Sequence, residues 1–375
     1  MTQDHIYSWE IIVMGIGSRI KQARSEAGMT QKGLAEKAKC EQSTVAHWES
    51  ERNLPSTEKL KSLADILGVS ASWLLSGESG GGTKTTKVPA SDPASTIAFQ
   101  GEPGAYSDLS CRVARPEMTT LACRSFEDAF AAVHDGIARL AMIPVDNSVA
   151  GRVADIHHLL PESGLHIIGE HFQRVNHHLL GVKGAKISDI THVHSHIHAL
   201  NQCKKLIAEL GITPVVAVDT AGSAHAIAES GDVTQAVIAS ELAGEIYGLT
   251  SLRADIEDAE HNTTRFLIMA RDPIIPHPMA GKTITSITFR VRNVPAALFK
   301  AMGGFATNGI NMTKLESYMV GGQFTATQFL ADVEGHPENR NLKLALEELA
   351  FFSHEVRVLG VYPPHPYRFE ANSEN

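Results

Sequence analysis

The sequence lacks the features that mark membrane proteins, secreted proteins and zinc ribbons. No apolar run approaches the ~20 residues that span a bilayer. The first residues contain Asp4 and Glu10 but no basic stretch, unlike a signal peptide. The four cysteines are scattered without a C-x-x-C pair, which argues against a disulfide framework or a zinc ribbon. We therefore expect a cytoplasmic protein with no membrane partner.

The length and composition that are present indicate a multidomain globular protein. A chain of 375 residues is too long for one ordinary core and predicts two or three domains. The net charge of −9 is uneven, because residues 15–78 hold nine Lys/Arg against eight Asp/Glu and the remainder carries the acidic excess. This acidic remainder argues against nucleic-acid binding over the whole surface but leaves it open for 15–78.

Periodicity and composition divide the chain into three folded segments. Apolar residues recur at helical spacing over 15–78, which predicts an all-α domain. Residues 79–94 are rich in Gly, Ser, Thr and Pro, as in a flexible linker. Strand-like and helical runs alternate over 95–272, which predicts an α/β domain with largely parallel strands. Residues 284–364 follow a β-α-β-β-α-β order, the α+β arrangement called ferredoxin-like.

Within 95–272, polar residues repeatedly follow an apolar strand. They do so in "GEPGAYS" (101–107), "DNS" (146–148) and "TAGS" (220–223). In parallel α/β folds the carboxyl ends of the strands form the ligand crevice, where backbone N–H groups bind anions. A single Ser or Asn there is more often a helix cap. Three such segments, together with the polar strand start "NTTR" (262–265), predict a site for a small anionic molecule.

Histidines alternate in "HVHSHIH" (192–198), which would suggest a metal site if they shared one face of a strand. No nearby Cys or acid completes a set of ligands. We therefore interpret the run as a solvated strand end and expect no metal. We also expect His261, beside the polar strand start, to support the reacting residues rather than to react.

Five segments, "GEPGAYSD", "PVDNSVAGRV", "HSHIHALNQC", "DTAGSA" and "NTTRF", resemble in order and spacing the catalytic domain of prephenate dehydratases. The resemblance implies a two-lobed core like that of periplasmic binding proteins. It also implies the conversion of prephenate to phenylpyruvate, CO₂ and water. Because aromatisation drives this reaction, the resemblance implies no metal or organic cofactor. Solute binding without catalysis is the alternative for such a core.

The resemblance gives the catalytic role to Thr264. A threonine hydroxyl is too weak an acid to ionise at neutral pH, so we expect it to donate a hydrogen bond to the departing oxygen. Arg265 would recognise a carboxylate or pin the cleft, and Phe266 would form an apolar wall. The other substrate-binding positions that the resemblance implies are Gly104, Tyr106, Ser107, Asn147, Ser148, Thr220 and Ala221. The family often has Thr-Phe in place of Ala105-Tyr106, and Glu in place of Asp146.

Residues 284–364, with "NVPAALFKAM" and "GINMTKLES", resemble the ACT regulatory domain that follows the catalytic domain in these enzymes. The resemblance implies L-phenylalanine as an effector bound at a subunit interface, and hence a homo-oligomer, either a dimer or a tetramer. The matching effector positions are Asn293, Ala296, Ala297, Leu298, Glu316 and Ser317. Tyr318-Met319 stands where the family often has Arg-Pro. Feedback inhibition would then shift the population between states of different activity.

Residues 16–77 resemble the Cro/repressor-like helix-turn-helix family through "MTQKGLAEKAKCEQSTVAHWESERNLPS" and "LADILGVSASWLLSGE". The resemblance implies binding to double-stranded DNA. Gln31 would cap the second helix or contact a phosphate. Base-reading positions on the recognition helix would be Gln42, Ser43, Thr44 and His47. Arg24 and Glu49 match a structural pair of that family. A helical domain that only dimerises or regulates remains the alternative.

Two functions therefore compete. The first is a prephenate dehydratase of L-phenylalanine biosynthesis with feedback control through the ACT domain. The second is a transcription regulator in which the dehydratase-like and ACT domains only sense aromatic metabolites. The intact NTTRF, DNS and DTA segments favour catalysis, because a sensor has little need for Thr264.

Overall fold

The computed structural model divides into two compact units, residues 1–90 and 91–375. The structure describes residues 16–26, 29–38, 40–50, 53, 55, 57–67, 92–153, 156–259, 261–292, 294–319 and 326–370. The predicted effector residue Asn293 and residues 79–91 of the predicted linker lie outside the described residues.

The N-terminal unit is built from short helices around one apolar core. Its helices are α1 (Ile16–Glu26), α2 (Gln31–Lys37), α3 (Gln42–Glu49) and α4 (Thr57–Leu67). Helix α2 begins after Thr30, whose side chain accepts a hydrogen bond from the N–H of Gly33 at 3.0 Å. The apolar faces of the helices meet in a core that includes Ile20, Leu34 and Leu63. The all-α prediction for this segment is confirmed.

The second unit begins with a lobe built on a mixed sheet. Its strands are β1 (Thr96–Gln100), β2 (Thr119–Cys123), β3 (Leu140–Asn147), β4 (Gly151–Arg152), β5 (His166–Arg174) and β11 (Thr263–Ala270). Its helices are η1 (Pro93–Ser95), α6 (Tyr106–Ala114), α7 (Phe126–His134), α8 (Ile156–Leu159) and η2 (Leu160–Glu162). Strands β1, β2 and β3 are parallel, but β11 runs antiparallel to both of its neighbours, β3 and β5. The prediction of largely parallel strands is therefore only partly right.

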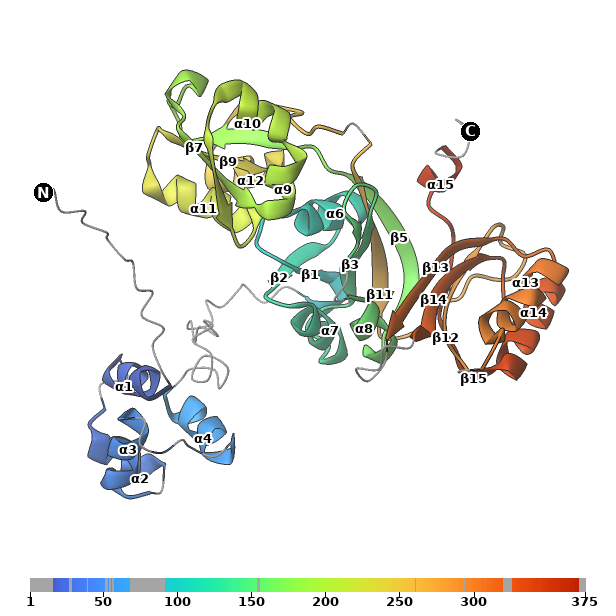
Figure 1. Cartoon of the computed structure of the whole chain (residues 1–375), viewed down its shortest axis with the longest axis horizontal. Helices are drawn as coiled ribbons and strands as arrows, with labels where there is room; N and C mark the ends of the chain where they lie inside the picture. The colour runs from blue at the N-terminus through green and yellow to red at the C-terminus, as the bar shows by residue number, and fades with distance from the viewer. Residues whose placement is uncertain are drawn as a thin grey trace, which may run out of the picture. The chain divides into compact units, whose positions relative to one another are not determined.

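A second lobe is inserted between β5 and β11, so two chain connections join the lobes (Figure 1). Its strands are β6 (His178–Gly181), β7 (His192–His196), β8 (Thr213–Ala217), β9 (Gln235–Ala239) and β10 (Thr250–Arg253), in the order β10-β6-β9-β7-β8. Its helices are η3 (Ile187–Asp189), α9 (Ile197–Gln202), α10 (Lys204–Leu210), α11 (Thr220–Ser230) and α12 (Glu241–Tyr247). Return of the chain from this lobe is what reverses β11.

The C-terminal part of the second unit has the predicted strand and helix order. Its elements are β12 (Ile284–Val291), α13 (Ala297–Thr307), β13 (Met312–Met319), β14 (Ala326–Glu334), α14 (Arg340–Phe352), β15 (Ser353–Tyr362) and α15 (Tyr367–Glu370). The strands lie in the order β13-β14-β12-β15, and α13 and α14 cover one face of them (Figure 1).

The C-terminal strands join the sheet of the first lobe. The junction is one parallel pair, Gly360 of β15 opposite Ile167 of β5. A Cβ at Gly360 would lie 2.0 Å from the carbonyl oxygen of Ile167, so only glycine permits this approach. Leu267 of β11 and Leu330 of β14 share one buried cluster with Tyr362. The first lobe and the C-terminal domain therefore have a continuous core.

Candidate active site

The polar start of β11 is paired with the end of β3. Thr264 lies opposite Asn147, and Arg265 lies opposite Asp146. Successive side chains of a strand point to opposite faces of the sheet. Thr264 and Asn147 therefore share one face, here called the front face, and Arg265 and Asp146 share the other, the back face. The register shifts between Arg265 and Phe266, as at bulges beside active sites.

On the front face, Asn147 fixes the hydroxyl of Thr264. The Nδ2 of Asn147 donates to Oγ1 of Thr264 at 2.9 Å and to Oδ1 of Asn262 at 2.8 Å. Its Oδ1 accepts from the backbone N–H groups of Val149 and Ala150, which determines the orientation of the amide. Because Oγ1 of Thr264 is an acceptor here, its proton points elsewhere, and no described residue accepts that proton. Thr264 is therefore an available hydrogen-bond donor.

A buried chain of polar groups continues from Asn147 into the second lobe. Nδ2 of Asn262 donates to Oε1 of Gln202 at 3.0 Å, and the same oxygen lies 2.9 Å from Nε2 of His177. Nδ1 of His177 lies 2.9 Å from the hydroxyl of Tyr106. Burial lowers the pKa of His177 by more than its bond to Gln202 raises it. This chain links groups of both lobes to the residue that holds Thr264.

Ser148 ties the end of β3 to the start of β11. Its Oγ donates to the carbonyl of His261 at 2.6 Å and accepts from the N–H of Thr263 at 2.9 Å. The His261 side chain is exposed. His261 therefore meets Ser148 through its backbone carbonyl, and the supporting role of its side chain stays a prediction.

The remaining predicted substrate residues lie at helix starts in both lobes. Ser107 is buried in the first turn of α6, the helix that covers the core beneath the front face. Thr220 and the buried Ala221 begin α11 of the second lobe, after the N-cap Asp219. No hydrogen bond among the described residues joins Ser107, Thr220 or Ala221 to Thr264.

Gly104 and Tyr106 have structural partners of their own. Gly104 has a positive φ of 88°, and a Cβ there would lie 2.7 Å from Cα of Ala243 in α12. Its carbonyl accepts from Oγ of Ser240 at 2.5 Å. The hydroxyl of Tyr106 donates to the carbonyl of Asn176 at 2.6 Å. Packing between the lobes therefore accounts for both residues without a substrate.

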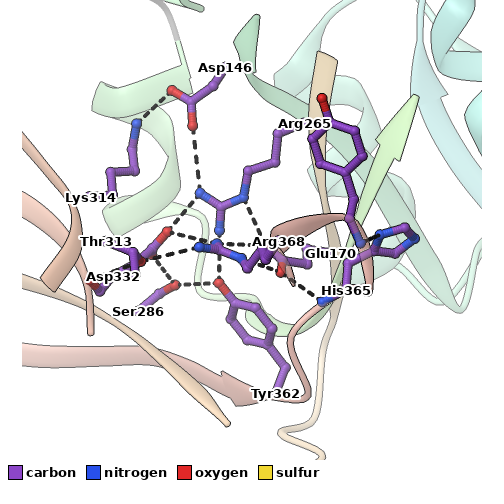
Figure 2. Close-up of polar contacts among 11 residues, drawn as sticks. Asp146, Glu170, Arg265, Ser286, Thr313, Lys314, Asp332, Tyr362, His365 and Arg368 are labelled. Carbon is purple, nitrogen blue, oxygen red and sulfur yellow. Dashed lines mark hydrogen bonds and ion pairs between the residues drawn. The ribbon is translucent and has the colours of Figure 1, made fainter. Parts of the chain in front are cut away.

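On the back face, Arg265 is buried among acidic groups (Figure 2). Its Nε donates to Oε2 of Glu170 at 2.9 Å, and its Nη2 donates to the hydroxyl of Tyr362 at 3.0 Å. Its Nη1 lies 2.6 Å from Oδ2 of Asp332. Arg368 contacts the same two carboxylates, Glu170 at 2.6 Å and Asp332 at 3.5 Å. All three guanidinium nitrogens of Arg265 are thus occupied.

Asp146 extends the cluster to the C-terminal domain. It lies 3.6 Å from Nη1 of Arg265 and 2.5 Å from Nζ of Lys314. The cluster therefore sets three cations, Arg265, Arg368 and Lys314, against three carboxylates, Asp146, Glu170 and Asp332. Its net charge is zero when all six are ionised.

The cluster keeps its buried carboxylates ionised. Burial would raise the pKa of Asp332, but Arg265 and the bond from Ser286 hold it below its ordinary value. Burial also opposes ionisation of Glu170, and Arg368 and Arg265 lower its pKa. Burial lowers the pKa of Arg265, but the facing acids raise it well above the ordinary value.

Arg265 and Phe266 are not placed as substrate contacts. The guanidinium of Arg265 lies on the face opposite Thr264 and is fully paired, so the geometry supports pinning rather than recognition of a substrate carboxylate. Phe266 is 1% exposed and packs in the core with Phe99 and Met142. Its ring supports the front face from within the core and does not form the wall of an open cleft.

A large cavity lies beside the back face; Asn147 and Ser148 also line it, but Thr264 does not. It has a volume of about 1100 Å³ and lies between the first lobe and the C-terminal domain, with Arg265, Lys314 and Arg368 in its wall. A smaller cavity of about 390 Å³ lies between the two lobes and is lined by Tyr106 and Asn176.

The described effector positions are Ala296, Ala297, Leu298, Glu316 and Ser317. Ala296 has a φ of 61° and is the N-cap of α13. Glu316, on β13, lies 3.8 Å from Arg152 of the first lobe and 3.6 Å from Lys314. The carbonyl of Ser317 accepts from Arg152 at 3.2 Å. The β13 positions therefore touch the catalytic part of the chain.

The predicted DNA-reading positions lie on α3, with Gln42 and Ser43 exposed and Thr44 and His47 half-exposed. The predicted structural pair is present, with Nε of Arg24 2.5 Å from Glu49. Gln31 does not cap α2, because Thr30 does. Instead, Nε2 of Gln31 donates to Glu49 at 2.8 Å.

The histidine run occupies a strand-to-helix junction, because β7 ends at His196 and α9 begins at Ile197. Nε2 of His194 lies 2.7 Å from Oε1 of Gln235. Within the described ranges, no group of three or more His, Cys, Asp or Glu side chains could hold a metal ion. No described helix is long and apolar enough to cross a bilayer.

Sequence analysis missed Asn262, Gln202 and His177 on the front face, and Glu170 and Asp332 on the back face. A signal existed for the two acids, because each directly follows a short apolar run within a strand, "IIG" before Glu170 and "FLA" before Asp332, and a buried charge needs a partner. Their partners could not be identified, since Glu170 and Arg265 are 95 residues apart in the chain.

Comparisons with known proteins match two parts of the chain to known domain families. A family model for prephenate dehydratase matches residues 97–274, and one for a helix-turn-helix domain matches residues 17–80. These matches define an enzyme, a dehydratase, that also carries a helix-turn-helix domain.

The chain is 56% identical over 272 residues to a bifunctional N-acyl-homoserine lactone acylase/prephenate dehydratase of Komagataeibacter europaeus, which covers 72% of this chain and 97% of that protein. It is 40% identical over 281 residues to the chloroplastic arogenate dehydratase/prephenate dehydratase 1 of Arabidopsis thaliana, 71% of each. The crystal structure of prephenate dehydratase from Arthrobacter aurescens in complex with L-Phe matches with a TM-score of 0.65 at 28% identity. That match covers 71% of this chain and 89% of that one. The chain belongs to the prephenate dehydratase family.

Proposed function

We propose that this chain converts prephenate to phenylpyruvate, CO₂ and water, with Thr264 as hydrogen-bond donor to the departing hydroxyl. The bond to the ring carboxylate breaks, and its electron pair enters the ring. The ring carbon–oxygen bond then releases hydroxide, which takes a proton and leaves as water. The observation that carries the proposal is the bond from Asn147 to Thr264, because it leaves the threonine proton free.

Preorganisation explains how so weak an acid assists. Asn147 is itself held by Asn262 and by two backbone donors, so Thr264 need not reorient during the reaction. Ser107 at the start of α6, and Thr220 and Ala221 at the start of α11, are proposed to complete the site from opposite lobes. Backbone N–H groups at those helix starts suit the two carboxylates of prephenate.

The test is turnover of prephenate by the purified full chain, followed as phenylpyruvate. Thr264→Val keeps the shape but removes the donor, and should lower kcat by about 10²–10³-fold. Thr264→Ser restores a hydroxyl and should recover most of that loss. Thr250→Val, on β10 of the second lobe, is the matched control. A wild-type chain without turnover, or a fully active Thr264→Val, would refute the assignment. Arogenate should be offered in parallel, because a relative carries both names.

We propose that L-phenylalanine is the effector, that residues 284–364 form an ACT domain and that the protein is a homo-oligomer. Support comes from the strand order of that domain and from a related prephenate dehydratase crystallised with L-Phe. Calorimetric titration with L-phenylalanine and analytical ultracentrifugation test these points. Binding without prephenate turnover would favour the metabolite-sensing regulator instead.

We propose that the N-terminal unit binds double-stranded DNA through α3. The observation in favour is that Gln42 and Ser43 are exposed while the Arg24–Glu49 pair fixes the helix beneath them. Binding to duplex DNA should weaken with salt along a straight log–log line. Gln42→Ala should weaken it and Ser50→Ala should not. Absent or salt-independent binding would leave the unit a structural domain.

A further inference from the structure

Thr264 has a chain neighbour that is held from the C-terminal domain. Arg265 follows it directly on β11 and is bound on the back face by Asp332 of β14 and Tyr362 of β15. The side chain of Arg265 is 8% exposed and that of Asp332 is 3% exposed. Because Asp332 and Tyr362 bind Arg265 directly, a shift of β14 or β15 must displace Arg265 or break these contacts.

Asn147, the partner of Thr264, has the same kind of neighbour. Asp146 precedes it on β3 and contacts Nζ of Lys314 of β13 at 2.5 Å. Lys314 is also 3.6 Å from Glu316, one of the proposed effector positions. A path of direct contacts therefore leads from Glu316 to the residue beside Asn147.

The two contacts are mechanically linked. Lys314 and Asp332 are register partners in the β13–β14 ladder, just as Asp146 and Arg265 are partners in the β3–β11 ladder. One pair of the C-terminal sheet thus faces one pair of the catalytic sheet across the back face (Figure 2). A movement of the β13–β14 pair therefore displaces β3 and β11 together.

We propose that Lys314, Asp332 and Tyr362 are positioning residues that transmit the state of the C-terminal domain to Thr264 and Asn147. We call these three residues the back-face clamp. The proposal rests on the proposed dehydratase function, and it adds the route by which an effector changes that site. The clamp sets the positions of β3 and β11, and these set the direction of the Thr264 hydroxyl.

The physical reason is the narrow tolerance of a hydrogen-bond donor. A displacement of about 1 Å at a reacting group costs about 10²-fold in rate. Thr264 and Asn147 have only neutral partners on the front face. Lys314 and Asp332 of the clamp are charged, and together they contact both β3 and β11. A regulatory movement is therefore imposed from the back face, without any effector contact to the substrate.

The experiment measures kcat and KM for prephenate in the full chain, with and without saturating L-phenylalanine. Lys314→Met and Asp332→Asn remove one clamp charge each while keeping side-chain size. Both should lower kcat by about tenfold, with KM changed by less than about twofold. The ratio of rates without and with L-phenylalanine should fall about fivefold towards one. Tyr362→Phe removes a single hydroxyl and should act in the same direction more weakly.

Arg357→Met is the matched control. Arg357 of β15 donates to the carbonyl of Pro161, so its loss also removes a contact between the C-terminal domain and the first lobe. It touches neither β3 nor β11. It should leave kcat, KM and the L-phenylalanine response at wild-type values.

A merely structural role predicts a different result. The clamp variants would then unfold at lower temperature, while kcat per folded molecule and the L-phenylalanine response stayed at wild-type values, and this outcome overturns the proposal. If Asp332→Asn does not fold, Lys314→Met and Tyr362→Phe decide. If wild-type enzyme is active but insensitive to L-phenylalanine, an unchanged kcat in these variants overturns the positioning role and a lowered kcat supports it.

Amide hydrogen exchange separates failure of the clamp from failure of the proposed function. If wild-type protein does not convert prephenate, L-phenylalanine should still change exchange in 263–270 and 140–147. That change should persist in Arg357→Met and disappear in Lys314→Met. Exchange that does not respond in wild-type protein would then overturn the clamp.

Discussion

The two faces of the β3–β11 pair surround neighbouring residues with opposite kinds of partner, neutral on one face and ionic on the other. On the front face, Thr264 and Asn147 belong to a chain of neutral amides, a hydroxyl and an imidazole. On the back face, Arg265 and Asp146 belong to a buried cluster of three cations and three carboxylates. The neutral face leaves one proton without an acceptor, whereas each cation of the ionic face is paired with a carboxylate.

The difference teaches how a strand can be both reactive and fixed. A carboxylate next to Thr264 would repel the proposed dianionic substrate, so neutral groups suit that face. Charges on the opposite face do not disturb the reaction. Their strong, specific pairing fixes the strand. Alternation along β11 separates the two tasks by a single residue.

The largest expected effect comes from breaking the back face. Arg265→Met leaves Asp332 buried without its main partner and leaves Glu170 with Arg368 as its remaining cation, and it should destabilise the unit by about 3–5 kcal/mol. Denaturant unfolding at neutral pH measures this loss. Arg253→Met is the control, because its pair with Glu209 is half-exposed and should contribute at most about 1 kcal/mol. Equal losses in the two variants would contradict the contrast between the faces.

A smaller effect is expected from the front face. Asn262→Ala removes the acceptor of Asn147 and the donor to Gln202, and should cost about 1–3 kcal/mol in stability. It should also lower kcat, because Asn147 would no longer hold Thr264 in one orientation. Asn308→Ala, a half-buried amide on the C-terminal domain, should leave kcat unchanged. Normal kcat in Asn262→Ala would show that the chain of amides does not position Thr264.

The smallest effect is a difference in acid sensitivity. The pKa of His177 is lower in the folded chain than its ordinary value of about 6.5, so the unfolded chain binds more protons below that pH. Stability should therefore be complete above pH ~6.5 and fall as the pH drops through the folded pKa, by at most about 1.4 kcal/mol per pH unit. His177→Gln should reduce this slope, and the remainder should come from His171 and His196, whose pKa values burial also lowers.

The back face should respond only at lower pH. The pKa values of Asp332 and Glu170 are lowered in the folded chain, so their contribution to stability is complete above pH 4.5, the ordinary value for Glu, and is lost as the pH falls through the folded values. Unfolding curves at pH 7, 5.5 and about 3.5 separate the two windows. If His177→Gln and wild type lost stability over the same pH range, the two faces would not differ in acid sensitivity.

Much of the fold could be predicted from local patterns. Alternating apolar runs and the order of strands and helices in 284–364 indicated the elements that the structure contains. The antiparallel direction of β11 could not be predicted, because it depends on where the chain returns from the second lobe. The single junction at Gly360 was equally hidden, since one residue pair leaves no periodic signal.

The site could be predicted where chemistry is local to a motif. Thr264, Asn147 and Ser148 were found through "NTTRF" and "DNS", and the structure brings their segments together. The side on which Arg265 acts was not predictable from adjacency to Thr264, because neighbouring strand residues point apart. The partners of Glu170 and Asp332 depend on tertiary packing alone.

The junction at Gly360 has a consequence for how such enzymes can be rebuilt. No side chain fits between Gly360 and Ile167. The C-terminal domain can therefore continue the catalytic sheet only with glycine at this position, and with any other residue it would only be tethered to the sheet. C-terminal domains exchanged between relatives should therefore join the sheet in register only when the domain supplied has glycine at this position. Any other residue there would yield a chimera whose two halves are joined in sequence, but in which a movement of one half is not transmitted to the other.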